Sequence, residues 1–320
     1  MQLHRVWILF WVFLVLAGSV ANGFAATKIR LALNWKPEPE FGGFYAAQQE
    51  GLFKSEGLDV EIVVGGAMQP VTQMVAAGKV EYGITSADEV LIARSKGTDL
   101  VAIFAVYQTN PQCIMVHEES GISSLQALLH SGSTVALQRG LPYAEFLNKT
   151  FGFTKVKPVP YAGGIGGFLH DPKFAQQCFV FSEPIAARRA GAKPRTFLIA
   201  DVGFNPYATV LVTRGKTKAT PAAAAELHQK MVRASRKGWN LYLKSPHKTN
   251  AYMHTLNDSL DLATYEEAAR VQVPLVKNED MSPEALGTMK LIRWKELQEQ
   301  LLGIKLQDHA IDVSEAFRNF

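Results

Sequence analysis

The chain has 320 residues, of which 48% are apolar, 19% charged and 10% aromatic, and its formal net charge is +4. The large apolar share excludes a disordered chain, and two cysteines are too few for a disulfide scaffold. The net charge is too small to indicate a nucleic-acid-binding protein. Because a single core stops growing near roughly 250–300 residues, the length predicts an α/β-type protein of two lobes.

The first apolar run predicts an export signal. Arg5 precedes an unbroken apolar stretch, Val6 to Ala17, which is short for a membrane span and matches the central region of a signal peptide. Small residues at Ser19-x-Ala21 and Gly23-x-Ala25 offer two cleavage sites, and neither is followed by a cysteine for lipid attachment. We expect residues 1–26 to be a cleavable signal peptide and the protein to be periplasmic. An uncleaved anchor is the alternative.

The next segment alternates strand and helix patterns. Alternating polar and apolar residues, or short apolar runs, indicate the strands. The segments between them have the start and stop residues that are typical of helices. The predicted strands cover residues 28–34, 59–64, 82–85 and 100–107, and the predicted helices 44–49, 68–77 and 86–95. This alternation predicts a mostly parallel sheet covered by helices.

A second α/β unit begins after Asn110-Pro111, and the chain breaks again at Asn205-Pro206. From residue 221 to residue 317 the pattern is almost entirely helical. The strands predicted in this part cover residues 114–117, 134–137, 156–160, 179–181 and 207–213. Two α/β units with a helical tail are therefore expected.

The two cysteines, Cys113 and Cys178, could pair in an oxidising compartment. Each lies in an apolar, strand-like run, where free cysteine behaves as a small hydrophobic residue. We expect them to be unpaired.

Open α/β sheets bind ligands beyond the carboxyl ends of their strands, so the residues that follow each predicted strand are candidates. They are rich in aromatic rings, amides and carboxylates, which suits a flat, polar heteroaromatic ligand. Each also has a structural alternative: a tryptophan can pack its turn, an acid can be solvated, and Ser or Asp can cap a helix. A glutamate that closes an apolar strand, at position 183, is the most suggestive. The candidate ligand-binding set is Trp35, Glu40, Tyr45, Gly66, Ser86, Asp88, Gln108, Arg139, Tyr143, Tyr161 and Glu183.

Motifs of catalysis are absent from the sequence. It contains no HExxH zinc motif, no GxSxG nucleophile elbow, no GxGxxG fingerprint and no Walker A loop, and its eight histidines are scattered. We therefore expect no catalytic residue, no metal site and no cofactor.

Five segments together resemble a known family. They are Leu33–Ala47 (LNWKPEPEFGGFYAA), Glu50–Phe53 with Glu56–Val60, Ala77–Gly83, Phe104–Gln108 and Gln177–Pro184 (QCFVFSEP), and the resemblance extends to about Thr213. The family is that of the periplasmic solute-binding proteins for thiamine pyrimidine precursors, with riboflavin-binding members and sulfonate-binding relatives. It implies a type II periplasmic-binding-protein fold, with two mostly parallel sheets joined by a two-strand hinge. Lobe I would comprise residues 27–110 plus 208–320, and lobe II residues 111–207.

The resemblance also implies a function. The protein would be a monomer that carries a small heteroaromatic compound to an ABC permease in the inner membrane, with no nucleic-acid partner. Thiamine pyrimidine precursors come ahead of riboflavin, and sulfonates third because Arg139 is the one basic residue of the set. By position, Trp35 and Tyr45 would stack on the ligand from lobe I, and Glu183 would accept a hydrogen bond from lobe II.

The family that the sequence resembles also contains an enzyme, the fungal thiamine-pyrimidine synthase, which carries a lysine for pyridoxal phosphate and a histidine four residues later. Thr85 and Glu89 stand at those two positions here, and the enzyme's cysteine-rich motif is missing from residues 203–209. We therefore expect a binding protein and not an enzyme. A periplasmic sensing subunit that docks on a membrane receptor is a further alternative.

Overall fold

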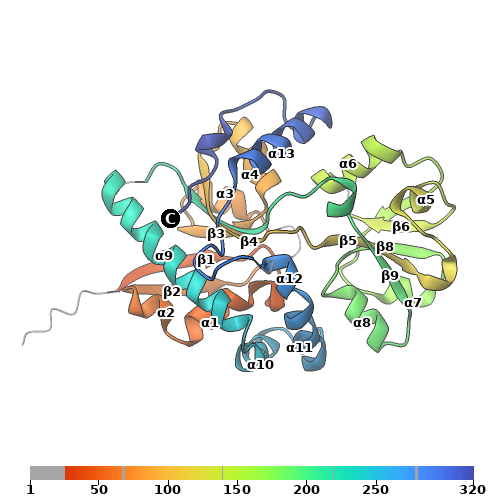
Figure 1. Ribbon diagram of the computed structural model, residues 1–320, viewed down its shortest axis with the longest axis horizontal. Helices are drawn as coiled ribbons and strands as arrows, with labels where there is room; N and C mark the ends of the chain where they lie inside the picture. Colours follow the sequence, from red (N-terminus) through yellow and green to blue (C-terminus); the bar gives the residue numbers. More distant parts are fainter. Residues whose placement is uncertain (1–25, 67–68, 139, 218, 278–279) are drawn as a thin grey trace, which may run out of the picture.

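The computed structural model describes residues 26–66, 69–138, 140–217, 219–277 and 280–320. Its strands form two five-stranded sheets, each covered by helices, and the two lobes lie side by side in Figure 1. The two-lobed fold expected from the resemblance is confirmed. The expected signal peptide, apart from its last residue, lies outside the described residues, as does Arg139 of the candidate site.

The first sheet has the strand order β2-β1-β3-β10-β4. Strand β1 runs parallel to β2 and β3, whereas β10 runs antiparallel to β3 and β4. The strands span Thr27–Ala32 (β1), Leu58–Val63 (β2), Tyr82–Thr85 (β3), Leu100–Tyr107 (β4) and Ala208–Arg214 (β10). The chain thus leaves this sheet after β4 and returns to it as β10, between β3 and β4.

The second sheet has the strand order β7-β6-β8-β5-β9. Its strands span Gln112–His117 (β5), Thr134–Leu137 (β6), Lys157–Pro160 (β7), Phe174–Phe179 (β8) and Pro194–Leu198 (β9). Strand β5 is antiparallel to β8 and β9. Among the described strands, four pairings are parallel and four antiparallel. The expectation of mostly parallel sheets was therefore wrong, because each sheet receives a strand that arrives from the other lobe in the reverse direction.

Two strand predictions in the second unit also need correction. The strand placed at residues 179–181 is β8, which ends at Phe179, and β9 was not predicted. The buried amides Gln176 and Gln177 interrupt the apolar pattern of β8. Strand β9 is half-buried at every position, so it shows no alternation.

Most helices surround the first sheet, and the helical tail packs there as well (Figure 1). Around the first sheet lie α1 (Gly42–Gln49), α2 (Leu52–Ser55), α3 (Val71–Ala76), α4 (Ala87–Ser95), α9 (Pro221–Tyr242), α10 (His247–Leu256), α11 (Leu262–Val271), α12 (Val273–Val276) and α13 (Leu291–Gly303). Around the second lie α5 (Leu125–Leu129), α6 (Pro142–Phe151), α7 (Gly166–His170) and α8 (Glu183–Arg189). Short 3-10 helices also occur in the described chain: η1 (Pro39–Phe41), η2 (Glu118–Ser120), η3 (Ala200–Val202) and η4 (Val313–Glu315). None of the helices in the described part of the chain has the length and hydropathy of a membrane span.

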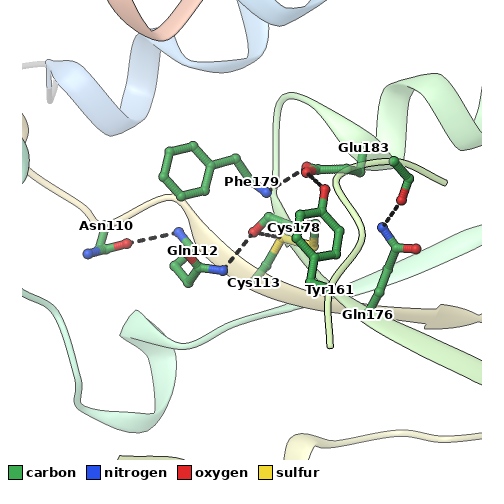
Figure 2. Close-up of a disulfide and its surroundings, with 9 residues drawn as sticks. Asn110, Gln112, Cys113, Tyr161, Gln176, Cys178, Phe179 and Glu183 are labelled. Atoms are coloured by element: carbon green, nitrogen blue, oxygen red, sulfur yellow. Dashed lines mark hydrogen bonds between the residues drawn. A yellow bond between two sulfur atoms is a disulfide. The ribbon is translucent and has the colours of Figure 1, made fainter. Parts of the chain in front are cut away.

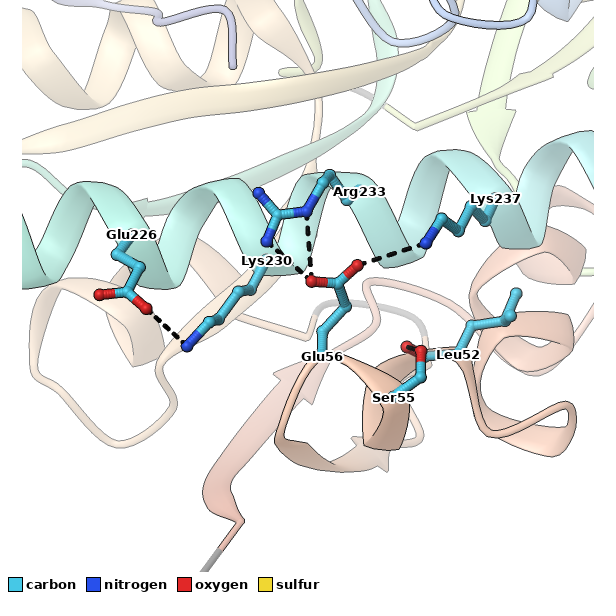
Figure 3. A network of polar contacts seen from close by, with 7 residues as sticks. All are labelled: Leu52, Ser55, Glu56, Glu226, Lys230, Arg233 and Lys237. Carbon is cyan, nitrogen blue, oxygen red and sulfur yellow. Dashed lines mark hydrogen bonds and ion pairs between the residues drawn. The ribbon is translucent and has the colours of Figure 1, made fainter. Parts of the chain in front are cut away.

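Helix α9 holds the segment between α1 and β2 in place. A Cβ atom at Gly43 would lie 2.1 Å from the Trp239 ring, so only glycine lets α1 and α9 approach this closely. At the rim, Glu56 accepts from Arg233 at 2.7 Å and pairs with Lys237 at 3.4 Å (Figure 3). The contacts fix the turn between α2 and β2 against the tail.

Two crossing segments connect the lobes, one between β4 and β5 and one between η3 and β10, and they contact each other. The backbone N–H of Asn110 donates to Asn205 Oδ1 at 2.8 Å, and Asn110 Nδ2 donates to the carbonyl of Pro206 at 3.0 Å. The Arg293 guanidinium donates to the carbonyls of Gln108 and Asn205, at 2.7 Å each, and so joins both crossings to α13. The predicted breaks at Asn-Pro lie in these crossings, and the lobe boundaries drawn from them stay a prediction.

Cys113 and Cys178 form a disulfide (Figure 2), so the expectation that they are unpaired was wrong. The two residues lie directly opposite each other in the β5–β8 ladder, with Cα atoms 5.1 Å apart. Antiparallel neighbours at this separation bring their sulfur atoms together. The sequence shows two apolar strands but not their register, and the register decides the pairing.

Candidate ligand-binding site

A cavity of about 510 Å³ lies between the lobes, and residues of both lobes line it. The first lobe contributes the turn after β1, the start of α3 and the N-terminus of α4. The second contributes the ends of β6, β7 and β8 and the starts of α6 and α8. The lobes touch beside it, because the ring of Phe181 stacks on Tyr107 with centroids 5.4 Å apart. The described lining includes Asn34, Trp35, Glu38, Glu40, Gln69, Gln73, Ser86, Asp88, Glu89, Asn110, Gln112, Gln138, Tyr143, Tyr161, Gln177, Phe179, Ser182 and Glu183.

Polar and aromatic side chains from both lobes line one part of the cavity. Trp35 Nε1 donates to Glu38 Oε1 at 3.3 Å within the first lobe. Across the cavity, Glu183 accepts from the Tyr161 hydroxyl at 2.5 Å and from the backbone N–H of Phe179 at 2.9 Å (Figure 2). These bonds fix the orientation of the Glu183 carboxyl group at the start of α8.

Three carboxyl groups in this part of the cavity have raised pKa values. Burial, together with the nearby Glu183, raises the pKa of Glu38 to about 8. Burial also raises the pKa of Glu40 well above its usual range, and Glu38 and Glu183 add to the effect. The pKa of Glu183 is raised by burial, against the lowering effect of its hydrogen bonds from Tyr161 and Phe179. Removal from water disfavours a charged carboxylate, so the surroundings of these three groups favour the protonated form.

The second lobe presents a group of amides. The Tyr143 hydroxyl donates to Gln177 Oε1, which also accepts from the backbone N–H of Gln138 at 2.7 Å. Gln177 Nε2 in turn donates to Gln138 Oε1 at 2.9 Å. Gln177 is buried in β8, where its hydrogen bonds compensate for the loss of water. The network holds Tyr143 and two amide groups rigidly at the cavity.

The N-terminus of α4 forms another part of the lining. Ser86, Asp88 and Glu89 all line the cavity, and Thr85 donates from its hydroxyl to the carboxylate of Glu89. Burial and the neighbouring Glu89 raise the pKa of Asp88 to about 6. By the resemblance described above, Thr85 and Glu89 stand at the positions of the synthase's lysine and histidine.

The structure brings together seven of the eleven predicted residues. Trp35, Glu40, Ser86, Asp88, Tyr143, Tyr161 and Glu183 line the cavity. Their role as ligand contacts stays a prediction.

Three predicted residues do not border the cavity. Tyr45 is 1% exposed in the core of the first lobe, where it packs edge-on against Tyr252. Gln108 turns away, and its Nε2 donates to the carbonyls of Ala105 and Thr288. Gly66 follows β2 but is not among the lining residues. The rule of strand ends selects a position along the chain and not the direction of a side chain, so it included them.

Sequence reasoning left Glu38, Glu89, Gln112, Gln138 and Gln177 out of the predicted set, although all of them line the cavity. Polar residues inside an otherwise buried strand are the signal that could have found Gln177. Among the described residues, no group of three or more His, Cys, Asp or Glu side chains is arranged to hold a metal ion.

Two sheets, two crossings and a cavity between the lobes define the periplasmic-binding-protein fold. The structure of the periplasmic aliphatic sulphonate-binding protein SsuA from Escherichia coli superposes with a TM-score of 0.68 at 16% identity, over 90% of this chain and 91% of SsuA. Residues 38–249 match the family described as NMT1/THI5 like, and the chain belongs to this family.

Relatives with similar sequences are named either as binding proteins or as a synthase. The riboflavin-binding protein RibY of Chloroflexus aurantiacus is 23% identical over 91% of this chain and 85% of its own length. The formylaminopyrimidine-binding protein of Halalkalibacterium halodurans is 28% identical over 41% of this chain and 39% of its own. The 4-amino-5-hydroxymethyl-2-methylpyrimidine phosphate synthase THI11 of Saccharomyces cerevisiae is 29% identical over 30% of this chain and 28% of its own.

Proposed function

We propose that this protein is the periplasmic substrate-binding component of an ABC importer for a small heteroaromatic compound, with thiamine pyrimidine precursors ahead of riboflavin. The observation that carries the proposal is the interlobe cavity, which sets Trp35 beside the carboxyl groups of Glu38 and Glu183. Aromatic faces stack on heteroaromatic rings, and carboxyl groups accept from ring amino groups. Relatives named for binding riboflavin and formylaminopyrimidine support the choice of ligand class.

The cavity lies at the junction of two lobes, and this position gives the proposed mechanism. A ligand that contacts Trp35 from the first lobe and Tyr161 and Glu183 from the second binds the closed arrangement more tightly than an open one. It therefore shifts the population toward closure. Export by the signal sequence, a monomeric state and delivery to an inner-membrane permease belong to the same proposal.

Transport and not synthesis is the proposed role, on the chemistry of two residues. Thr85 cannot form a Schiff base with pyridoxal phosphate, and Glu89 has no imidazole to donate. Both side chains instead bond to each other beside the cavity. A sensing role at a membrane receptor would use the same cavity. Uptake of the ligand by intact cells distinguishes the two roles, because uptake depends on this protein only if it serves transport.

A sulfonate ligand is disfavoured by the side chains that line the cavity. Glu38, Glu40, Asp88, Glu89 and Glu183 line it, and its described lining contains no lysine or arginine. Sulfonates are usually held by arginine or lysine donors, and this described lining offers carboxyl groups instead. The resemblance of the fold to SsuA therefore does not extend to its ligand in our proposal.

A thermal-shift panel tests this proposal. The purified protein is heated with 4-amino-5-hydroxymethyl-2-methylpyrimidine, its formylaminomethyl analogue, thiamine, riboflavin or taurine. We expect stabilisation by a heteroaromatic member, since a ligand at 100 times its dissociation constant adds roughly 2.7 kcal/mol to the free energy of unfolding. A shift with taurine and with none of the aromatic compounds would contradict the proposal.

Trp35→Ala is the matching variant. If the Trp35 ring stacks on the ligand, its removal abolishes the thermal shift, whereas Trp35→Phe keeps part of it. Tyr252→Ala serves as the control, because Tyr252 is a partly exposed aromatic residue outside the cavity lining. An unchanged shift in Trp35→Ala would mean that Trp35 only packs its turn.

A further inference from the structure

Carboxyl groups gather along the described lining of the cavity. Its described lining holds five carboxyl groups and no lysine, arginine or histidine. Lys36 lowers the pKa of Glu38, but burial and Glu183 outweigh it. Lys36 itself lines a neighbouring cavity of about 430 Å³, which shares Trp35, Glu38 and Glu183 with this one. Carboxyl groups that are buried together cannot all be ionised without a cation beside them.

Two of these carboxyl groups are also short of partners. Glu40 is 6% exposed, and burial and two neighbouring carboxyl groups act on its pKa with no hydrogen bond to offset them. Asp88 is 6% exposed as well, and its Oδ1 lacks a hydrogen-bond partner within the described part of the chain. Buried polar atoms are nearly always paired in a native protein. Unpaired acceptors that face a cavity therefore indicate that a ligand supplies the donors.

The two acidic ends of the cavity differ in their surroundings. Asp88 and Glu89 lie in the first turn of α4, where the helix dipole favours negative charge, and Glu89 accepts from Thr85. Glu40 lies near Glu38 and Glu183, and each of these two carboxyl groups acts on it electrostatically without a compensating donor. The end at Glu40 thus has the greater need for positive charge.

We propose that the ligand occupies this cavity as a cation: a heteroaromatic compound whose protonated amine lies against Glu38, Glu40 and Glu183 while its ring stacks on Trp35. This inference rests on the proposed function and names the charge of its ligand. A primary ammonium group has three donors, which matches three carboxyl groups. A cationic ring system beside the indole of Trp35 also gains cation–π attraction.

Two pyrimidines that differ in one group test the inference. The probes are 4-amino-2-methylpyrimidine with a 5-aminomethyl group, which is protonated at neutral pH, and the same ring with a neutral 5-hydroxymethyl group. Calorimetric titration of the full protein at pH 7 measures both dissociation constants. We expect the aminomethyl compound to bind at least tenfold more tightly. Equal binding, or tighter binding of the hydroxymethyl compound, would overturn the inference.

Variants locate the charge. Glu40→Gln keeps the shape of the side chain and removes its charge, so the preference for the aminomethyl compound should fall at least threefold. Glu38→Gln gives a second measurement in case Glu40→Gln does not fold. Glu226→Gln, on the exposed face of α9, is the control and should leave the ratio unchanged. Loss of the preference in Asp88→Asn but not in the Glu40 or Glu38 variants would contradict the placement.

The failure of this inference can be separated from the failure of the proposed function. If riboflavin binds and the aminomethyl compound does not, the charge assignment is wrong and the proposed function stands. If no heteroaromatic compound binds, the proposed function is itself wrong.

Discussion

Glu38 sits in the cavity wall with its carboxyl group bonded to Trp35 Nε1 and its pKa raised to about 8. A carboxyl group whose pKa is raised on folding binds protons more tightly in the native state than in the unfolded one. Its contribution to stability is complete below the usual pKa of 4.5 and is lost as the pH rises through 8. Glu40 and Glu183 are shifted in the same direction. Ligand-free protein should therefore lose stability between about pH 5 and pH 9.

Glu38→Gln tests this assignment. The amide oxygen still accepts from Trp35, but the side chain no longer titrates. We expect the melting temperature of the variant, relative to that of the unchanged protein, to rise steadily from pH 5 to pH 9. Circular dichroism without ligand measures it. A difference that is independent of pH would show that Glu38 titrates normally. Burial lowers the pKa of His228 from 6.5 to about 4, so His228 adds stability as the pH rises between these values. Both proteins share this effect, and it cancels in the difference.

At the scale of elements, the disulfide joins the neighbouring strands β5 and β8 of the second sheet. It closes a loop of 65 residues and lies beside the cavity, which Cys178 lines. A cross-link of this kind stabilises mainly by restricting the unfolded chain, typically by about 2–4 kcal/mol.

Cys113→Ala/Cys178→Ala should lower the free energy of unfolding by about that amount and leave the fold intact. Urea denaturation of both proteins measures the loss. As a check on the bond itself, alkylation of the unfolded and unreduced protein should find no thiol. Two alkylated cysteines would mean that the disulfide does not form.

Helices α8 and α11 face each other across the junction between the lobes and carry two ion pairs. Arg188 lies 2.9 Å from Glu267, and Arg189 lies 3.0 Å from Asp261. Each pair is partly exposed, so each contributes only roughly 0.2–1 kcal/mol. Because both pairs join one lobe to the other, that small energy acts on closure.

Asp261→Asn/Glu267→Gln should therefore weaken ligand binding by about two- to tenfold. The asparagine still caps α11 through its oxygen, as Asp261 does for Thr264. Titration with the ligand found in the thermal-shift panel measures the change, and Glu315→Gln, which breaks a pair within one lobe, is the control. Affinity equal to that of the control would show that the pairs do not act on closure.

At the scale of the whole molecule, the sequence predicted the two-lobed fold and most of the strands, because alternation and Gly/Pro breaks are local signals. Residues 82–85, 100–107 and 134–137 are strands as predicted. The pairing of strands that lie far apart in the sequence could not be predicted from these local signals. The antiparallel direction of β5 and β10 and the register that joins Cys113 to Cys178 depend on segments far apart in the chain.

The same limit applies to the site. The rule of strand ends found Trp35 and Glu183, which are near in space and distant in sequence. It also chose Tyr45, which turns into the core, and passed over Gln177, which lies inside a strand. Which face a side chain presents is decided by packing between elements, and the sequence pattern carries that information only where one face is clearly apolar.

The central claim is that this protein binds one heteroaromatic compound between its lobes and releases it unchanged. Native mass spectrometry of the purified protein, after incubation with an equimolar mixture of the panel compounds, tests it most directly. We predict a one-to-one complex with a heteroaromatic member that is absent for Trp35→Ala, and after denaturation a free ligand of unaltered mass. Capture of taurine alone, or a ligand recovered as a chemically altered product, would contradict the account.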